Sequence, residues 1–251
     1  MPWPPPSSLH VRRFVSSPEA VERLFCFPYS GAGASVFLPW SRSFPERIEV
    51  CAIEYPGRGS RSVEPLLTSV DDVVNHGIDG LSSFLDKPFS VLGYSLGAFV
   101  AFEWLHKLRK LGGPAPSNFF VCACRAPQVQ ATRPLLHPVP GREFIDAVQR
   151  RYGGIPSVIL NEPELLARLL PILRADLSAA ELYSRPEKSP LSCAIHVFGG
   201  TRDQSTRRDD LAPWSSHTNA GFSLRMIEGD HFLISSKKKT LEELVIKILM
   251  P

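Results

Sequence analysis

The stretch Phe89-Ser90-Val91-Leu92-Gly93-Tyr94-Ser95-Leu96-Gly97 decides the fold of this chain. An apolar run typical of a buried strand leads into Gly93-Tyr94-Ser95-Leu96-Gly97, and a helical pattern follows from Ala98 to Lys110. This order is typical of a nucleophile elbow, a sharp turn between a strand and a helix that exposes a serine. Glycines are expected on either side because such a strained turn brings backbone segments too close for a Cβ atom. The prediction rests on the strand and helix around the motif, since the five-residue motif by itself is a weak signal of a catalytic serine.

Short apolar runs alternate with helical patterns along the rest of the chain. Runs that are apolar throughout are typical of parallel strands covered by helices on both faces. The alternation therefore predicts an α/β protein with a doubly wound, mostly parallel central sheet. The strands are expected at residues 23–27, 48–54, 89–93, 118–124, 193–198 and 223–227, and the helices at residues 69–85, 96–111, 207–217 and 235–249.

One segment interrupts this alternation. About sixty residues separate the strand near Cys124 from the next one, far more than a crossover needs, and they hold helical stretches at 144–152, 162–173 and 175–183. We expect a single domain at 21–251 with a helical lid insertion at about 130–187, because such insertions lie beside the carboxyl ends of the strands. A passive surface excursion is the alternative. Residues 1–20 are expected to form a Pro-rich, partly disordered leader.

The composition is that of an ordinary globular protein, with 251 residues, 43% hydrophobic residues and a net charge of +3. The charge is small and no basic stripe is interleaved with aromatics, so nucleic acid is not an expected partner. No apolar stretch is long enough for a bilayer and no secretory signal is visible, so we expect a cytoplasmic protein without a membrane partner. The cysteines lie in strand-like runs and lack metal-ligand spacing, so we expect buried thiols and no metal site: Cys26, Cys51, Cys122, Cys124 and Cys193.

A serine nucleophile needs a base within hydrogen-bond reach and an acid that orients this base. After a nucleophile elbow the acid and then the histidine follow along the chain, each on a loop after a later strand. His231 lies directly after the last expected strand, and Asp203 follows the strand at 193–198. Ser95, Asp203 and His231 are therefore the candidate catalytic residues. The rival acids are Asp209, Asp210 and Asp230, and the other histidines are interpreted as structural: His10, His76, His106, His137, His196 and His217.

The reaction also needs donors for an oxyanion, usually backbone N–H groups. One candidate is the N–H of Leu96, directly after the serine at the start of a helix. The second is the N–H of Ser30, in the glycine-rich turn that follows the first strand. A phosphate-binding loop is the alternative for this turn, but its sequence matches neither common nucleotide-binding pattern.

Six motifs together resemble those of type II thioesterases, stand-alone α/β-hydrolases that serve polyketide, nonribosomal-peptide or fatty-acid synthases. The resemblance covers the chain from about Leu24 onward. It departs from the family in the leader and in Tyr94, where the family often has histidine. The motifs are LFCFPYSGAGAS at 24–35, YPGRGSR at 55–61, GYSLG at 93–97, LPILRADLSAAELY at 170–183, FGGTRDQ at 198–204 and GDHFLI at 229–234.

The resemblance implies an α/β-hydrolase fold, the triad and oxyanion donors just named, and a mobile lid over an acyl pocket at residues 133–183. It implies that the substrate is an acyl group on the phosphopantetheine arm of a carrier protein (ACP or PCP), hydrolysed by an editing enzyme without a cofactor. We also expect a monomer. The alternatives are a carboxylesterase or lipase acting on oxygen esters, a chain-releasing thioesterase, and a non-catalytic acyl-binding protein.

Further charged and aromatic residues carry weaker expectations. Arg58 and Arg61 are expected either at the mouth of the site, facing a carrier protein or phosphate, or in solvent on a loop. Asp176 is expected to have a structural role, pairing with Arg174 or capping a helix. Trp104 and Trp214 are expected in the core.

Overall fold

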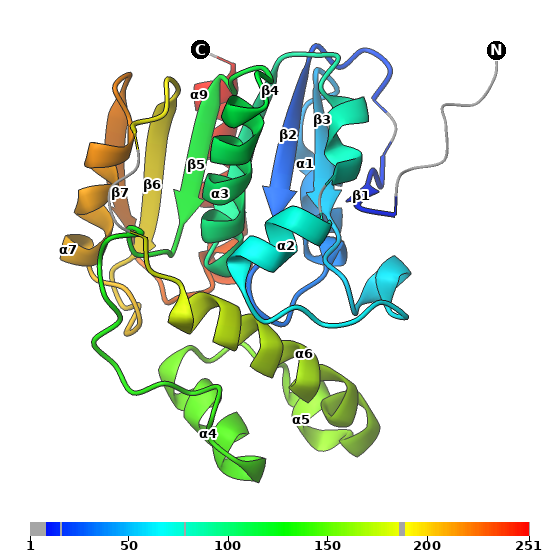
Figure 1. The fold of residues 1–251 in the computed structure, drawn as a ribbon, viewed down its shortest axis with the longest axis vertical. Coiled ribbons are helices and arrows are strands. Elements are labelled where there is room, and N and C mark those ends of the chain that lie inside the picture. Colours follow the sequence, from blue (N-terminus) through cyan, green and yellow to red (C-terminus); the bar gives the residue numbers. More distant parts are fainter. Residues whose placement is uncertain (1–8, 16, 78, 186–188, 251) are drawn as a thin grey trace.

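A seven-stranded sheet forms the centre of the computed structural model, which describes residues 9–250 apart from residues 16, 78 and 186–188 (Figure 1). The strand order is β1-β3-β2-β4-β5-β6-β7. All neighbouring strands are parallel except β1, which pairs antiparallel with β3 at the edge. The mostly parallel sheet predicted from the apolar runs is therefore confirmed.

Six of the seven strands lie where the apolar runs predict them, with ends that differ by one or two residues. Strands β2 to β5 are almost entirely buried, as expected for strands covered on both faces. The strands are β1 (Val11–Arg12), β2 (Glu22–Phe27), β3 (Ile48–Ile53), β4 (Phe89–Tyr94), β5 (Asn118–Cys122), β6 (Ala194–Gly200) and β7 (Phe222–Ile227).

The second half of the expected leader contains the short strand β1, which the sequence did not predict. Val11 is fully buried and lies opposite Ile53, and Arg12 lies opposite Ala52. A strand of two residues is too short to show the alternation by which strands are recognised in sequence. Residues 1–8, the Pro-rich start of the expected leader, lie outside the described residues.

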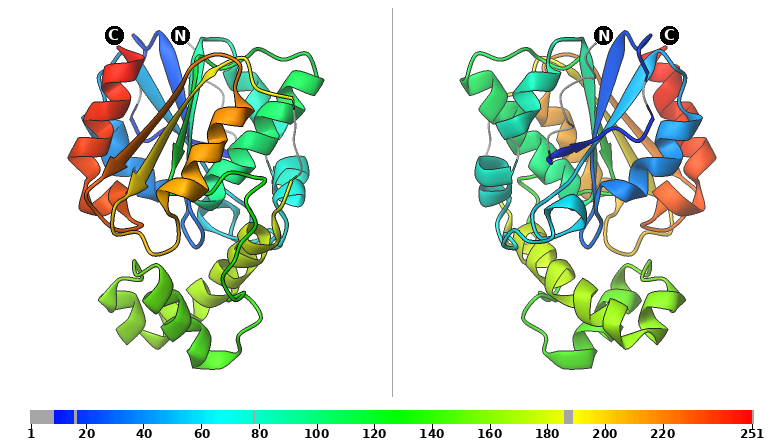
Figure 2. Two further views of the ribbon diagram at one scale, coloured as in Figure 1. Left: turned by 90° about the vertical axis from the view of Figure 1, so that its left-hand side faces the viewer. Right: turned by 90° about the vertical axis from the view of Figure 1, so that its right-hand side faces the viewer.

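Helices cover both faces of the sheet, and Figure 2 shows α1 and α9 on one side with α2, α3 and α7 on the other. Each face holds its own apolar cluster; Trp104 and Trp214 belong to the α3 side, as expected for core residues. The helices are α1 (Leu38–Ser43), α2 (Val70–Gly77), α3 (Leu96–Lys110), α4 (Gly141–Arg151), α5 (Ser157–Asn161), α6 (Pro163–Leu182), α7 (Arg208–Leu211), α8 (Leu233–Ser236) and α9 (Lys238–Leu249).

Three expected helices are shorter or more broken than their patterns suggest. The pattern at 69–85 forms α2 and then a 3₁₀ helix at Asp79–Phe84, and the pattern at 207–217 forms α7 and then a 3₁₀ helix at Ala212–His217. The pattern at 235–249 is divided at Lys237 between α8 and α9. Helix α1 and the 3₁₀ turns at Ala34–Phe37 and Gly59–Arg61 were not expected, because such short elements show little periodicity.

Helices α4, α5 and α6 form an insertion between β5 and β6, beyond the carboxyl ends of the strands (Figure 1). The insertion has its own small apolar cluster, which includes Phe144, Val148, Leu173 and Leu177. The two helical stretches expected at 162–173 and 175–183 are one helix, α6, which continues through Pro171. The insertion therefore forms a separate helical layer facing the sheet edge where the candidate residues converge.

All five cysteines are free and buried. Burial raises the pKa of each thiol, and that of Cys193 is raised to about 11. At neutral pH these side chains therefore remain protonated and behave as small apolar groups. Within the described residues, no helix combines the length and the apolar character needed to cross a membrane.

Candidate active site

Ser95 lies in a strained turn between β4 and α3, with a φ of 51° and a ψ of −118°. The flanking glycines are there for steric reasons. A Cβ atom on Gly93 would lie 2.3 Å from the Cα of Ala98, and one on Gly97 would lie 2.1 Å from the carbonyl oxygen of Phe27. The sequence thus folds into a nucleophile elbow, which exposes the serine at the carboxyl end of β4.

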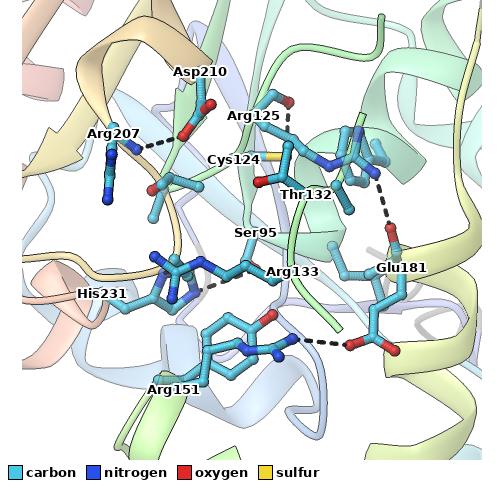
Figure 3. Close-up of a pocket in the computed structure, with 18 of the residues that line it drawn as sticks. Ser95, Cys124, Arg125, Thr132, Arg133, Arg151, Glu181, Arg207, Asp210 and His231 are labelled. Atoms are coloured by element: carbon cyan, nitrogen blue, oxygen red, sulfur yellow. Dashed lines mark hydrogen bonds and ion pairs between the residues drawn. The ribbon is translucent and has the colours of Figure 1, made fainter. Parts of the chain in front are cut away.

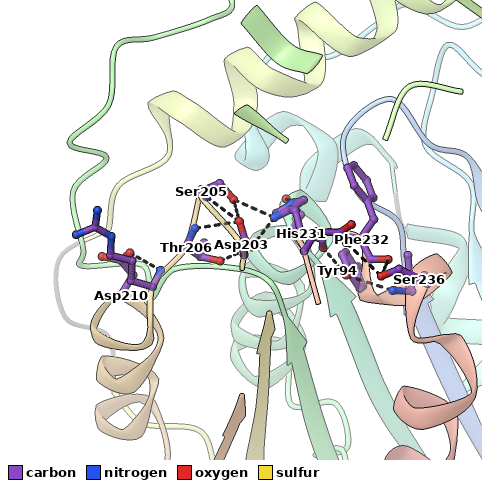
Figure 4. A network of polar contacts seen from close by, with 12 residues as sticks. Tyr94, Asp203, Ser205, Thr206, Asp210, His231, Phe232 and Ser236 are labelled. Carbon is purple, nitrogen blue, oxygen red and sulfur yellow. Dashed lines mark hydrogen bonds and ion pairs between the residues drawn. The ribbon is translucent and has the colours of Figure 1, made fainter. Parts of the chain in front are cut away.

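The structure brings Ser95, His231 and Asp203 together in one chain of hydrogen bonds. Figure 4 shows the part of this chain between His231 and Asp203. The Nδ1 of His231 is 2.8 Å from Oδ2 of Asp203, and its Nε2 is 3.3 Å from Oγ of Ser95. With Nδ1–H donating to the carboxylate, Nε2 is left to accept the serine proton. The three residues follow β4, β6 and β7, whose parallel direction places all three loops at one edge of the sheet.

Asp203 is held ionised by the groups around it. Burial alone raises its pKa, but the hydrogen bond and charge of His231, together with the Ser205 and Thr206 hydroxyls, outweigh burial and hold the pKa below its ordinary value. The Ser205 hydroxyl donates to Oδ1 over 2.6 Å, and the Thr206 hydroxyl donates to Oδ2 over 2.7 Å. An ionised carboxylate is the form that orients a histidine base.

Ser205 also lies 2.9 Å from Nδ1 of His231, so its oxygen contacts both the acid and the base. Sequence reasoning missed this residue. The available signal was a hydroxyl residue two positions after the aspartate, a spacing at which side chains commonly bond within a turn.

Replacing Ser205 with alanine is expected to lower kcat/KM for the reaction at Ser95 by about tenfold to a hundredfold, since hydrogen bonds to charged groups contribute roughly 1.5–3 kcal/mol. Ser205→Thr retains the hydroxyl and should keep activity within about threefold of the wild type. Steady-state kinetics of both variants, with circular dichroism as the folding control, test this role. Equal losses in the two variants would show that packing at this position matters more than the hydroxyl.

Tyr94 holds the loop that carries His231. Its side chain is fully buried, its hydroxyl donates to the backbone carbonyl of His231 over 2.6 Å, and the N–H of Ile234 donates to the same hydroxyl. Burial raises the pKa of Tyr94 well above its usual value, so the hydroxyl remains a donor at neutral pH. Tyr94 thus lies beneath the histidine loop and positions it.

Replacing Tyr94 with phenylalanine leaves the His231 carbonyl and the Ile234 N–H without this partner. The expected cost is about 1–3 kcal/mol in the free energy of unfolding, as for other buried groups left unsatisfied. Urea denaturation of the variant and the wild type measures this difference. An unchanged unfolding midpoint would contradict the role given to the hydroxyl.

A protein-family model described as "Thioesterase domain" matches residues 22–249, which is nearly the whole chain. The chain belongs to the thioesterase family. A thioesterase is a hydrolase acting on thioesters.

Among its relatives, this thioesterase is 37% identical to the gramicidin S biosynthesis protein GrsT of Aneurinibacillus migulanus, covering 90% of this chain and 88% of that protein. It is 34% identical to thioesterase PikA5 of Streptomyces venezuelae, covering 92% and 82%. The solved structure of the type II thioesterase BorB from the borrelidin biosynthetic cluster superposes with a TM-score of 0.85 at 26% identity, covering 96% of each chain. These likenesses confirm the α/β-hydrolase fold and the resemblance found in the sequence motifs.

Two cavities of this thioesterase meet at Ser95 and His231, which line both. The first, of about 430 Å³, is bordered by the loop after β5, the start of the insertion and the Asp203 loop (Figure 3). The second, of about 300 Å³, lies between the glycine-rich turn and the helices of the insertion. A substrate whose reactive carbonyl lies at Ser95 therefore has space on two sides.

The two candidate oxyanion donors lie beside these cavities. Leu96 begins α3 and lines the first cavity, and Ser30 follows β2 and lines the second. Gly31, the next residue, has a φ of 82° and donates its N–H to Oδ2 of Asp176 over 2.7 Å. The turn carrying Ser30 is thus attached to helix α6.

Arg58 and Arg61 are buried, so neither expectation for them is correct. The two terminal guanidinium nitrogens of Arg58 donate to the two carboxylate oxygens of Asp176, over 2.5 and 2.8 Å. Arg61 donates to Glu64 and to the backbone carbonyl of Glu54. The structural role expected of Asp176 is confirmed, but its partner is Arg58 of a distant loop rather than Arg174.

Two of the three rival acids, Asp210 and Asp230, have other partners. Asp210 accepts the backbone N–H of Arg207, and Asp230 accepts the backbone N–H of Phe232, so each is bonded within its own turn. Across the part of the chain that the structure describes, no group of three or more metal-ligating side chains is placed to hold an ion.

Proposed function

We propose that this thioesterase hydrolyses acyl groups from the phosphopantetheine arm of carrier proteins, with Ser95 as the nucleophile, His231 as the general base and Asp203 as the orienting acid. The observation that carries the assignment of these roles is the hydrogen-bond chain from Ser95 through His231 to Asp203. The Ser–His–Asp order of the hydrogen bonds is the one that serine hydrolysis uses, and the position at the sheet edge is typical of α/β-hydrolases.

In the proposed reaction, Ser95 Oγ attacks the thioester carbonyl carbon while Nε2 of His231 takes its proton. The backbone N–H groups of Leu96 and Ser30 stabilise the resulting oxyanion. The C–S bond then breaks, the thiol leaves with a proton from His231, and an acyl-enzyme remains on Ser95. A water molecule that gives its proton to His231 attacks this ester, and the acid is released as Ser95 regains its proton.

The names of the relatives support a role in a biosynthetic assembly line. GrsT is a gramicidin S biosynthesis protein, and BorB is a type II thioesterase from the borrelidin biosynthetic cluster. By analogy we assign this chain an editing role, the removal of unproductive acyl groups from carriers. Such a role favours an enzyme that accepts several short acyl groups over one that is selective for a finished product.

The insertion at residues 130–187 acts as a lid in this proposal. The helices of the insertion line the second cavity, and the ring of Tyr152, at the end of α4, lies 5.1 Å from the ring of His231 between centroids. Opening of this layer would admit the substrate, and closure would exclude water from the acyl pocket. In this proposal the lid is part of a single hydrolase domain at residues 21–251, and the rest of that domain forms the core.

The proposed substrate class is tested by measuring thiol release from acetyl, butyryl and hexanoyl groups on a phosphopantetheinylated carrier protein, beside hydrolysis of ethyl esters with the same acyl chains. We expect faster turnover of the carrier thioesters at equal concentration. Turnover of the ethyl esters without thiol release from any carrier would replace the proposal with a carboxylesterase. Binding of acyl carriers without turnover of either substrate would indicate a non-catalytic acyl-binding protein.

We further propose that the enzyme acts as a monomer in the cytoplasm. Its exposed large apolar side chains lie on separate elements, including Val63, Leu111, Val158 and Phe222, rather than on one helix face. The five free cysteines suit a reducing compartment. Light scattering at several protein concentrations tests the oligomeric state.

A further inference from the structure

The two cavities at Ser95 differ in chemical character. The second is lined mainly by apolar groups of the insertion, including Val148, Ile155, Leu173 and Leu177, and its lining contains no lysine, arginine, aspartate or glutamate. The first is lined by four arginines but only two acidic residues. The four arginines are Arg125, Arg133, Arg151 and Arg207, and the acids are Glu181 and Asp210.

Two of these arginines are used by the protein itself. Arg125 donates to the backbone carbonyls of Val129 and Tyr183, and its pKa is lowered by burial. Arg151 bonds Glu181 and the carbonyl of Pro134. Their guanidinium groups therefore stabilise the wall of the cavity, and their donors are already used within the protein rather than available to a ligand.

Arg133 and Arg207 remain. Figure 3 shows both at the cavity that contains Ser95 and His231. Among the described residues neither guanidinium takes part in an ion pair. Asp210, three residues after Arg207, accepts the backbone N–H of Arg207 rather than its guanidinium. Arg207 is exposed and Arg133 is half-buried, so the two charges lie toward the rim. Two unpaired guanidinium groups at the rim favour an anion there, because guanidinium forms bidentate bonds with phosphate and carboxylate.

We propose that Arg133 and Arg207 bind the phosphate of the phosphopantetheine arm, and that the acyl chain enters the second, apolar cavity. This inference rests on the proposed function. A thioester extends in two directions from its carbonyl, and Ser95 lines both cavities. The apolar acyl chain matches the apolar cavity, while the arm, with its amides and terminal phosphate, matches the arginine-lined one. The phosphate lies at the far end of the arm, which suits contacts at the rim rather than near Ser95.

The test uses three small thioesters without a carrier protein: butyryl-pantetheine, butyryl-phosphopantetheine and succinyl-pantetheine. For the wild type we expect kcat/KM to be about tenfold higher with the phosphate than without it, as for a charged hydrogen bond at a partly exposed site. The double variant Arg133→Gln/Arg207→Gln should bring this ratio close to one, and each single variant should lower it by about threefold. Arg168→Gln removes one charge, as each single variant does, at an exposed position of the insertion that lines neither cavity, and it should retain the wild-type ratio.

Three results would overturn the inference. The first is hydrolysis of all three thioesters with no gain from the phosphate, which leaves the proposed function intact. The second is a gain with succinyl-pantetheine that is lost in the double variant, which assigns the arginines to an acyl carboxylate. The third is an arginine effect seen only with acyl carrier proteins, which assigns them to the carrier surface. Failure to cleave any thioester, including acyl carriers, would reject the proposed function itself.

Discussion

Replacing Ser95 with alanine is expected to reduce thioester hydrolysis by about 10⁵-fold to 10⁶-fold, the loss typical when a serine nucleophile is removed from such a triad. The variant lacks the oxygen that forms the acyl-enzyme, so only the oxyanion donors and substrate binding remain. Thiol release from a butyryl carrier protein, followed with a thiol reagent, measures the loss. The φ of 51° at this position is no more strained for alanine than for serine, so the fold should be retained.

A matched control is Ser192→Ala, which removes an exposed hydroxyl just before β6, at the opposite end of the sheet. It should hydrolyse the same substrate at the wild-type rate. Ser95→Ala activity above about one hundredth of the wild type would indicate that water is activated directly by His231 and that no acyl-enzyme forms. Mass spectrometry of Ser95 after rapid quenching distinguishes the two routes, because only the covalent route adds the acyl mass to this residue.

Replacing Asp176 with alanine is expected to lower the free energy of unfolding by about 3–5 kcal/mol, the usual cost of removing one partner from a buried ion pair. The variant leaves the guanidinium of Arg58 buried without its carboxylate, and the N–H of Gly31 without its acceptor. Urea denaturation followed by tryptophan fluorescence measures the change. Because Gly31 follows Ser30, folded variant protein should also show a lower kcat, through a displaced oxyanion donor.

Two further variants separate charge from packing at this site. Asp146→Ala removes an exposed carboxylate from α4 in the same insertion and should change stability by less than about 0.5 kcal/mol. Arg58→Met with Asp176→Leu replaces the whole pair by apolar groups and should recover much of the stability lost in the single variant. If the double variant is no more stable than Asp176→Ala, packing rather than the unpaired charge accounts for the loss.

The parallel sheet and the grouping of the candidate residues could be predicted because both depend on local patterns. Apolar runs mark the buried strands, and the sequence order of Ser95, Asp203 and His231 reflects the order of the strands that carry them. Parallel strands place their following loops at one edge, so three residues distant in sequence were predicted to be neighbours. The glycines of the elbow were informative because the backbone approaches so closely at Gly93 and Gly97 that no other residue fits there.

Contacts between separate layers could not be predicted in this way. The bond from Arg58 to Asp176 joins the loop after β3 to helix α6, and no periodicity within either segment indicates the pairing. The contact of Ser205 with His231 depends on how two loops meet, which is set by the packing of β6 beside β7. Strand β1 and helix α1 are too short to show a pattern, and packing against the finished sheet determines them.

The burial of the cysteines has a consequence for an enzyme whose proposed product is a free thiol. Of the five cysteines, Cys124 is the one that lines the cavity proposed for the arm, through which the thiol would leave. Mixed disulfides form through attack by a thiolate, and burial keeps Cys124 protonated and only 3% exposed. The catalyst is in this way protected against capture by its own product, and it should stay active under mildly oxidising conditions in which the released pantetheine forms disulfides.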